Sequence, residues 1–427
     1  MTGIVDTSQS AVRKMSWRLL PLIGLSYLMA YMDRANVSFA AVQMNVDLGF
    51  SATVYGLGAG LFFVGYSLFE IPSNLLMVRF GPRRWIARIM ATWGLISASM
   101  NFVETPVQFY VLRFLLGVAE AGFFPAVLFY LSMWFPAAWR GRAVSRFYIA
   151  VPLSTALMGL LAGWLLGLDG HLGLDGWQWL FLIEGLPAVV LAVVLLWLLP
   201  DTPQSVTWLS DEEKRWVAQS LANDVKTSGA THEGIVRVLL NPMVLGIGLV
   251  MALDFACSSA VSFSAPVLLM QTTGWAVHEV GYLTAVSGVF SSVLMLIICA
   301  RSDRATSRYP YILAMALIGA FMCGLLSRAP DLWSSIGSYL LFAAATLIFG
   351  PLCLVLITEV LHPDSRAVGY AAVNTIAQVG NFSGPVLWGL AADRAGDFNF
   401  ALSVIPFVLL LAALITLRLQ HQAQRAR

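Results

Sequence analysis

Long apolar stretches follow one another along the chain, separated by short polar connections. Each stretch is close to the length of about 20 residues that an α-helix needs to cross the hydrocarbon core of a bilayer. Twelve can be recognised, over residues 16–40, 53–78, 84–104, 107–132, 141–167, 177–200, 243–272, 277–300, 308–328, 333–360, 366–392 and 396–419. The pattern predicts an all-α integral membrane protein with twelve transmembrane helices.

The only long polar connection, residues 201–242, divides the twelve stretches into two sets of six. We therefore predict a six-helix bundle over residues 1–200, a cytoplasmic loop over 201–242, and a second six-helix bundle over 243–427. Within the loop, Ser210 followed by Glu213 is the pattern of a capping box, which predicts the start of a short surface helix.

Corresponding positions in the two halves show a weak repeat. Basic turns follow the second and the eighth predicted helix, at residues 79–84 and 302–308. Two related six-helix bundles around a central site are typical of many secondary transporters. Glycines at four-residue spacing, Gly159 with Gly163 and Gly56 with Gly60, predict close packing between helices.

Composition and charge agree with a membrane protein. Of the 427 residues, 59% are hydrophobic and 11% are charged, whereas soluble domains carry about 25% charged residues. The predicted external segments hold only Arg328 and Arg394, so an excess of positive charge lies on the other side, and both termini are predicted to be cytoplasmic, as in a bacterial inner-membrane protein. The net charge of +2 gives no indication of nucleic-acid binding.

Neither a metal site nor an enzyme motif is visible. The four cysteines all fall in apolar stretches, so we expect neither disulfides nor a cysteine-rich metal site. No HExxH, GxSxG or P-loop pattern occurs. We therefore predict that the chain is not an enzyme, needs no cofactor, and functions as a monomer.

Two arginines, Arg34 and Arg113, lie inside predicted transmembrane helices. A charge at the centre of a bilayer helix costs about 2.5–3.5 kcal/mol on insertion scales, which suggests a function. At a rise of about 1.5 Å per residue, both lie about 10 Å below the outer boundary. Because a guanidinium group binds carboxylates with two parallel hydrogen bonds, the pair predicts a site for an organic anion.

Hydroxyl groups share one face of the first helix with Arg34. Tyr27, Tyr31 and Ser38 recur at helical spacing around it. Tyr31, one turn away, is predicted to contact a substrate that carries hydroxyl or carbonyl groups. For Tyr27 and Ser38, hydrogen bonding between helices is an equally good interpretation.

Acidic residues accompany both arginines. Glu120 follows Arg113 by seven residues, about 10 Å deeper along the axis, and is predicted to lie near the midplane without a fixed partner. A buried carboxyl group holds its proton more tightly than an exposed one, so Glu120 is predicted to carry a proton. Asp33 is expected to alternate between pairing with Arg34 and binding a proton. The alternative is a buried structural ion pair between the first and fourth helices.

The five histidines support carboxyl groups as the proton carriers, because none falls inside a predicted transmembrane core. They are His171, His232, His278, His362 and His421. Among other polar residues, Asp254 is expected either to face the cavity or to be capped by Ser258. Glu184 is interpreted as structural.

Four motifs resemble the major facilitator superfamily, and more narrowly its anion:cation symporter family. They are Tyr31-Met-Asp33-Arg34-Ala-Asn36-Val-Ser38, Gly65-Tyr66-Ser-Leu-Phe-Glu70-Ile-Pro72-Ser-Asn74, Arg113-Phe-Leu-Leu-Gly-Val-Ala-Glu120-Ala-Gly-Phe-Phe-Pro125 and Gly176-Trp-Gln-Trp-Leu-Phe-Leu-Ile-Glu184-Gly. The resemblance spans the whole chain. It includes the branch of tartrate, phthalate, hydroxyphenylacetate and sugar-acid transporters.

The resemblance implies that Arg34 and Arg113 bind the substrate carboxylate and that Asp33 and Glu120 are protonated during the cycle. It also implies that three further residues line the substrate cavity, namely Tyr31, Tyr66 and Asn374. Two positions in the eleventh helix depart from the family pattern. Gln378 and Asn381 replace an asparagine and a glycine there, which would alter substrate preference if both face the cavity.

We therefore predict a secondary transporter that takes up a small organic anion with protons. A hydroxy acid such as tartrate, or a sugar acid, fits the hydroxyl-bearing face. An anion exchanger, or an efflux pump on the same fold, is the alternative. A sensor that binds an anion without moving it is less consistent with the short tails and loop.

Overall fold

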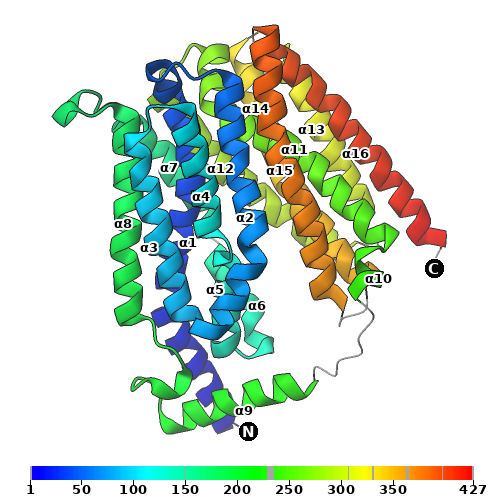
Figure 1. The fold of residues 1–427 in the computed structure, drawn as a ribbon. Helices are drawn as coiled ribbons and strands as arrows, with labels where there is room; N and C mark the ends of the chain where they lie inside the picture. Colours follow the sequence, from blue (N-terminus) through cyan, green and yellow to red (C-terminus); the bar gives the residue numbers. More distant parts are fainter. Residues whose placement is uncertain are drawn as a thin grey trace.

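A computed structural model describes residues 2–148, 150–227, 235–305, 307–328, 331–361, 365–396 and 398–425. The regular structure in these ranges is helical, without a strand (Figure 1). The predictions for His232 and His362 lie outside the described residues.

The described residues of the N-terminal half form the helices α1 to α8 and short 3₁₀ turns. The helices are α1 (Thr2–Asp47), α2 (Ala52–Phe80), α3 (Pro82–Ser99), α4 (Pro106–Glu120), α5 (Phe123–Trp134), α6 (Ala137–Tyr148), α7 (Ala150–Leu166) and α8 (Gly176–Leu198), and the turns are η1 (Met100–Phe102), η2 (His171–Gly173) and η3 (Pro203–Ser205). These elements correspond to the first six predicted segments, because α4 with α5 and α6 with α7 each account for one.

The C-terminal half follows two connecting helices, α9 (Asp211–Thr227) and α10 (Ile235–Leu239). Its six helices are α11 (Pro242–Thr273), α12 (Val277–Asp303), α13 (Tyr309–Leu326), α14 (Leu332–Val360), α15 (Arg366–Ala395) and α16 (Asn399–Arg425). Among the described residues, eight helical spans are long and apolar enough to cross a membrane. The helices α4 and α5 count as one of these spans. The other predicted segments, 16–40, 84–104, 141–167 and 366–392, are helical as well.

The predicted capping box in the central loop is confirmed. The Ser210 amide donates to Glu213 Oε2 at 2.8 Å, and the Glu213 amide donates to Ser210 Oγ at 3.2 Å. Glu213 also accepts hydrogen bonds from Ser10 Oγ at 2.8 Å and Lys14 Nζ at 2.9 Å on α1. Desolvation would raise the pKa of Glu213, but these hydrogen bonds outweigh it and hold the pKa below its usual range. The helix α9 is thereby fixed under the N-terminal half (Figure 1).

The fourth transmembrane segment is broken, so the prediction of one continuous helix over 107–132 was wrong. The helix α4 ends at Glu120, and Gly122 adopts a left-handed conformation with φ of 84°. A Cβ atom at Gly122 would lie 2.5 Å from Ser73 Oγ, so only glycine fits there. Ser73 Oγ donates to the Ala121 carbonyl at 2.6 Å, which satisfies a backbone group that the break leaves free.

Each half has hydrophobic packing of its own. One buried cluster is built almost entirely from residues 11–217 and includes Trp93, Trp134 and Trp177. Two further clusters lie within residues 238–419. The predicted boundaries at residues 200 and 242 stay predictions, since separate cores do not locate a boundary to the residue.

The two halves meet closely at one end, which we call the outer end because few arginines lie there. At this end α2 packs on α15, and α7 packs on α12, whereas the halves diverge toward the opposite end (Figure 1). Glycine makes the contact possible, because a Cβ at Gly56 would lie 2.2 Å from the Pro385 carbonyl oxygen, and one at Gly281 would lie 2.2 Å from that of Gly159. The close packing predicted for these glycines therefore lies between the halves.

Polar contacts reinforce the outer end. The amides of Ala52 and Thr53, at the start of α2, donate to Asp393 at 3.0 and 2.8 Å. Asp393 belongs to α15, so a carboxylate of one half caps a helix of the other. Tyr55 Oη donates to the Phe263 carbonyl at 2.7 Å, again across the halves.

Replacing Gly281 with leucine is expected to separate the outer ends, because its side chain would collide with the Gly159 backbone. After replacement of the native cysteines, spin labels at the exposed positions Leu172 and Trp333 should report a longer distance. Gly337→Leu is the control, because a Cβ at Gly337 meets no atom within 4 Å. Equal distances in both variants would contradict the role of Gly281.

Candidate functional site

Four ionisable side chains come together inside the N-terminal half. Asp33 and Arg34 come from α1, and Arg113 and Glu120 come from α4. Asp33 and Arg113 are each 1% exposed and Glu120 is fully buried, whereas the Arg34 side chain keeps 26% of its surface. Burial of this much charge is costly unless the groups are paired, so the pairing defines the site.

Arg34 and Glu120 form an ion pair between α1 and α4. Arg34 Nε lies 2.7 Å from Glu120 Oε2. The prediction that Glu120 has no fixed partner was therefore wrong, whereas its greater depth relative to the arginines stays a prediction. Counting residues locates backbone atoms, whereas a long arginine side chain can reach a neighbouring helix at another depth. The alternative of a buried ion pair between these helices describes the contact that is present.

Aromatic rings surround the Arg34 guanidinium. Its Cζ atom lies 5.3 Å from the ring centre of Tyr31, 5.5 Å from that of Phe62 and 5.1 Å from that of Tyr66. Such contacts stabilise a cation by about 0.5–2 kcal/mol. The structure thus brings the predicted residues Tyr31 and Tyr66 to Arg34, together with Phe62.

Arg113 is buried but incompletely bonded. Its Nε donates to the Gly58 carbonyl at 3.4 Å, and neither Nη1 nor Nη2 has a hydrogen-bond partner among the described residues. Its Cζ lies 5.1 Å from the ring centre of Phe62, the ring that Arg34 also contacts. The two guanidinium groups therefore share one aromatic neighbour, and the donors of Arg113 are available for an anion.

Asp33 points toward α3 rather than toward Arg34. Asp33 Oδ1 accepts a short hydrogen bond from Ser97 Oγ and a longer one, at 3.4 Å, from Asn36 Nδ2. Asp33 Oδ2 and Glu120 Oε1 have no donor among the described residues, and the two carboxyl groups interact with each other. Two carboxyl groups at close range cannot both be ionised without a large cost, so this pair favours binding a proton.

Tyr27 lies behind Tyr31. Its hydroxyl donates to that of Tyr31 at 3.3 Å, and its ring packs on Phe123 and Phe147. Ser38 Oγ donates to the Ala35 carbonyl at 2.7 Å. The interpretation as hydrogen-bonding residues fits both positions.

The placement of the predicted C-terminal residues Asn374, Gln378 and Asn381 at the substrate cavity stays a prediction. Asn374 is half-buried on α15, and Asn381 Nδ2 donates to Gln378 Oε1 at 2.8 Å. Over the ranges that the structure describes, no hydrogen bond or ion pair connects these three residues with α1 or α4.

Asp254 is 1% exposed, so it lies inside the C-terminal half. Both of its oxygens lack a donor among the described residues. Capping by Ser258 is not formed, because Ser258 Oγ donates to the Phe255 carbonyl at 3.4 Å. Cys257 and Cys353 lie within electrostatic reach of the Asp254 carboxyl.

Three neighbours of the cluster were missed from sequence. Phe62 lies one turn before Tyr66 on α2, and this spacing was an available signal. Asn36 was noticed only as part of its motif. Ser97 on α3 carried no signal, because a lone serine in an apolar helix is unspecific.

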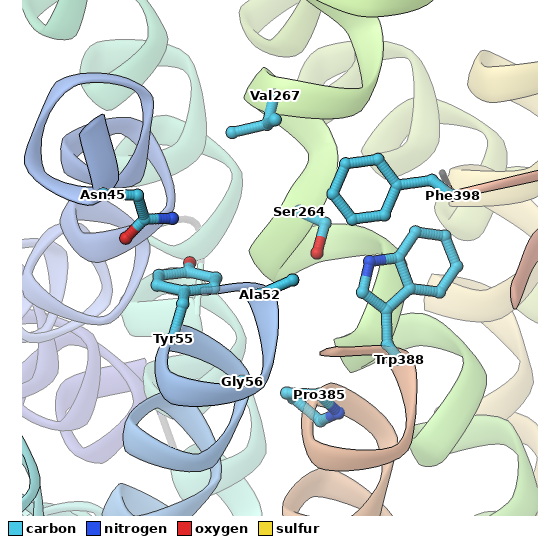
Figure 2. Close-up of a pocket in the computed structure, with 9 residues that line it drawn as sticks. All are labelled: Asn45, Ala52, Tyr55, Gly56, Ser264, Val267, Pro385, Trp388 and Phe398. Atoms are coloured by element: carbon cyan, nitrogen blue, oxygen red, sulfur yellow. The ribbon is translucent and has the colours of Figure 1, made fainter. Parts of the chain in front are cut away.

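Above the cluster, a small cavity separates the halves at the outer end (Figure 2). Tyr55 and Asn45 face it from one half, and Ser264, Trp388 and Phe398 face it from the other. Its volume of about 30 Å³ is comparable to the share of one water molecule in the liquid. The outer route to the cluster is therefore closed in this conformation.

The chain resembles known proteins in sequence and in fold. The family model described as Major Facilitator Superfamily matches residues 23–253 and 247–427. The chain belongs to the major facilitator superfamily. As a member, it is a membrane transport protein and not an enzyme, with the superfamily's twelve-helix, two-bundle fold.

Named relatives cover nearly the whole chain. A proposed tartrate transporter of Agrobacterium vitis is 38% identical, over 99% of this chain and 95% of its own. A quinolone resistance transporter of Acinetobacter baumannii is 36% identical, over 99% and 98%.

Among solved structures, a bacterial homologue of the human lysosomal transporter Spinster, in an inward-facing and unoccupied conformation, has a TM-score of 0.83. It shares 17% identity and is aligned over 96% of this chain and 98% of its own. The D-xylose–proton symporter has a TM-score of 0.73 at 20% identity, over 94% and 97%. At these identities the similarity shows the fold of this superfamily member.

A double-mutant cycle between Arg34→Leu and Glu120→Leu tests the ion pair. Each single replacement leaves a buried or half-buried charge unpaired and should lower the free energy of unfolding by about 3–5 kcal/mol. The double variant should be destabilised by less than the sum, because no orphaned charge remains. Denaturant unfolding in detergent measures all four proteins, and additive losses would show that the two groups are not coupled.

Proposed function

We propose that this superfamily member takes up a small organic anion together with protons. The observation that supports the proposal is the buried Arg113 guanidinium, whose Nη1 and Nη2 lack partners among the described residues and lie near a pair of interacting carboxyl groups. A guanidinium fork without a partner matches a carboxylate. The adjacent acidic pair supplies a place for the coupling proton.

The ion pair links the two events. While Glu120 is ionised, it forms an ion pair with Arg34. A proton on Glu120 removes its negative charge and releases Arg34 to share a substrate carboxylate with Arg113. Because both steps use one guanidinium, the proton and the anion favour each other's binding.

The chemistry around Arg34 favours a hydroxylated acid. Tyr31 and Tyr66 place phenol groups next to the guanidinium, and phenols exchange hydrogen bonds with substrate hydroxyls. The relative named for tartrate is consistent with such an anion. We therefore propose a hydroxy acid or sugar acid, transported by a protein of the anion:cation symporter type, with Asp33 and Glu120 as proton sites.

Efflux or anion exchange on the same fold is the second candidate. The relative named for quinolone resistance favours it. Counterflow separates exchange from symport, because an exchanger accumulates labelled anion only when the vesicles are preloaded. The excess of arginine on one side supports a bacterial inner-membrane orientation with both termini in the cytoplasm.

Proteoliposomes with an imposed inward proton gradient are expected to accumulate labelled tartrate or an aldonate above the outside concentration. A protonophore should reduce uptake to equilibration. Counterflow in the same vesicles shows that the protein is active. If uptake is then independent of the proton gradient, proton coupling is rejected but the transport function is not.

Arg113→Lys is expected to raise the KM for the anion by about tenfold or more, because lysine keeps the charge but cannot form the bidentate hydrogen bonds of a guanidinium group. Arg328→Lys is the matched control, because this arginine lies at the outer end of α13 and away from the cluster. An unchanged KM in Arg113→Lys would contradict the assignment of Arg113 as an anion ligand.

A further inference from the structure

A third acidic residue, Glu184 on α8, lies next to the cluster and is not used by the proposed cycle. It is 7% exposed, and both carboxyl oxygens are buried without a hydrogen-bond donor among the described residues. The following residue, Gly185, packs directly on α3, where a Cβ would lie 2.6 Å from the Gly94 carbonyl oxygen. The tight contact between α3 and α8 holds Glu184 away from the lipid and the aqueous phase.

Asn36 connects Glu184 with Asp33. The Asn36 side chain donates through Nδ2 to Asp33 Oδ1 at 3.4 Å and also interacts with Glu184. Asn36 Oδ1 is a buried acceptor without a donor. A protonated Glu184 has one O–H to donate, so a proton on this carboxyl group would satisfy the orphaned acceptor.

Among the described residues, no cation compensates the charge of an ionised Glu184. From α1, Asp33 is the ionisable group that interacts with it, while Arg34 on the same helix is paired with Glu120. From α3, Ser97 and Trp93 are neutral, and the arginines of α3 lie in its first two turns at the other end. The helix α7 carries no ionisable side chain.

Arg113 on α4 interacts with Asp33, but Glu184 has no such cation, and a buried carboxylate without a cation next to a second carboxylate is strongly unfavourable. Asp33 and Glu184 therefore cannot both be ionised in this conformation. The charge state of one must depend on that of the other, which is the behaviour of a coupled pair.

We infer that Glu184 is a third proton-binding carboxyl group of this transporter, coupled to Asp33 through Asn36, and that it sets the pH at which Asp33 gains its proton. The inference rests on the proposed proton-coupled function and extends it. Glu184 acts through Asp33 and does not touch the substrate, so it is a positioning residue.

Glu184→Gln preserves the size and polarity of the side chain but cannot ionise. Without a neighbour that can become negative, Asp33 should bind its proton less readily. In a plot of gradient-driven uptake against pH, the decline on the alkaline side is expected to move toward lower pH by about one unit. A shift of that size corresponds to about 1.36 kcal/mol of lost interaction between the two carboxyl groups. Counterflow at saturating proton concentration should remain. An unchanged pH profile in Glu184→Gln would overturn the inference.

Two further variants separate titration from structure. Glu184→Asp keeps an ionisable group and should restore most of the wild-type pH profile. Asn36→Val removes a hydrogen-bond donor from Asp33, which favours the protonated form, so its alkaline limb should move toward higher pH, opposite to Glu184→Gln. A purely structural role would instead make Glu184→Gln resemble wild type and Glu184→Asp the more impaired variant.

Infrared difference spectra of the purified protein, recorded across the same pH range, give a readout that does not depend on transport. The carboxylic acid C=O band should lose intensity in Glu184→Gln relative to wild type. An identical band in both proteins would overturn the inference. Loss of gradient dependence in the wild type would instead reject the proposed function, so the two failures are distinguishable.

Discussion

Burial of charge in a low-dielectric interior is the constraint on which the rest of this structure depends. Asp33, Arg113 and Glu120 have almost no exposed surface, and Arg34 keeps only part of its own. Each arginine must be paired with an anion, and each carboxyl group must be paired or protonated. The Arg34–Glu120 pair satisfies one cation, whereas Arg113 and two carboxyl oxygens remain incompletely bonded. That imbalance is what gives an anion and a proton favourable places to bind.

Backbone features serve the same constraint. The break at Gly122 ends α4 directly after Glu120, so the carboxyl group sits at a helix end whose carbonyls need other donors. Ser73 supplies one of them. Aromatic rings pack around Arg34, which lowers the local dielectric and strengthens the remaining electrostatic interactions.

The location of the cluster within one half is consistent with transport by movement of the halves. The glycine contacts between α2 and α15 and between α7 and α12, with the Asp393 cap on α2, close the outer end. These contacts involve backbone atoms and a few hydrogen bonds, so they can open without unfolding either hydrophobic core. A rocking motion would then expose the same charges to either side in turn.

The sequence by itself determined the membrane class, the helical segments and the presence of Arg34 and Arg113 within those segments, because hydropathy depends only on residue order. It also indicated Tyr31 and Tyr66, which share helix faces or motifs with these groups. Only the tertiary structure decided that Glu120 pairs with Arg34, that Asp33 turns toward Ser97 and Asn36, and that Glu184 is buried without a hydrogen-bond donor among the described residues. These contacts depend on how each helix is rotated about its axis and on which neighbours a long side chain reaches. The spacing of residues along the sequence specifies neither.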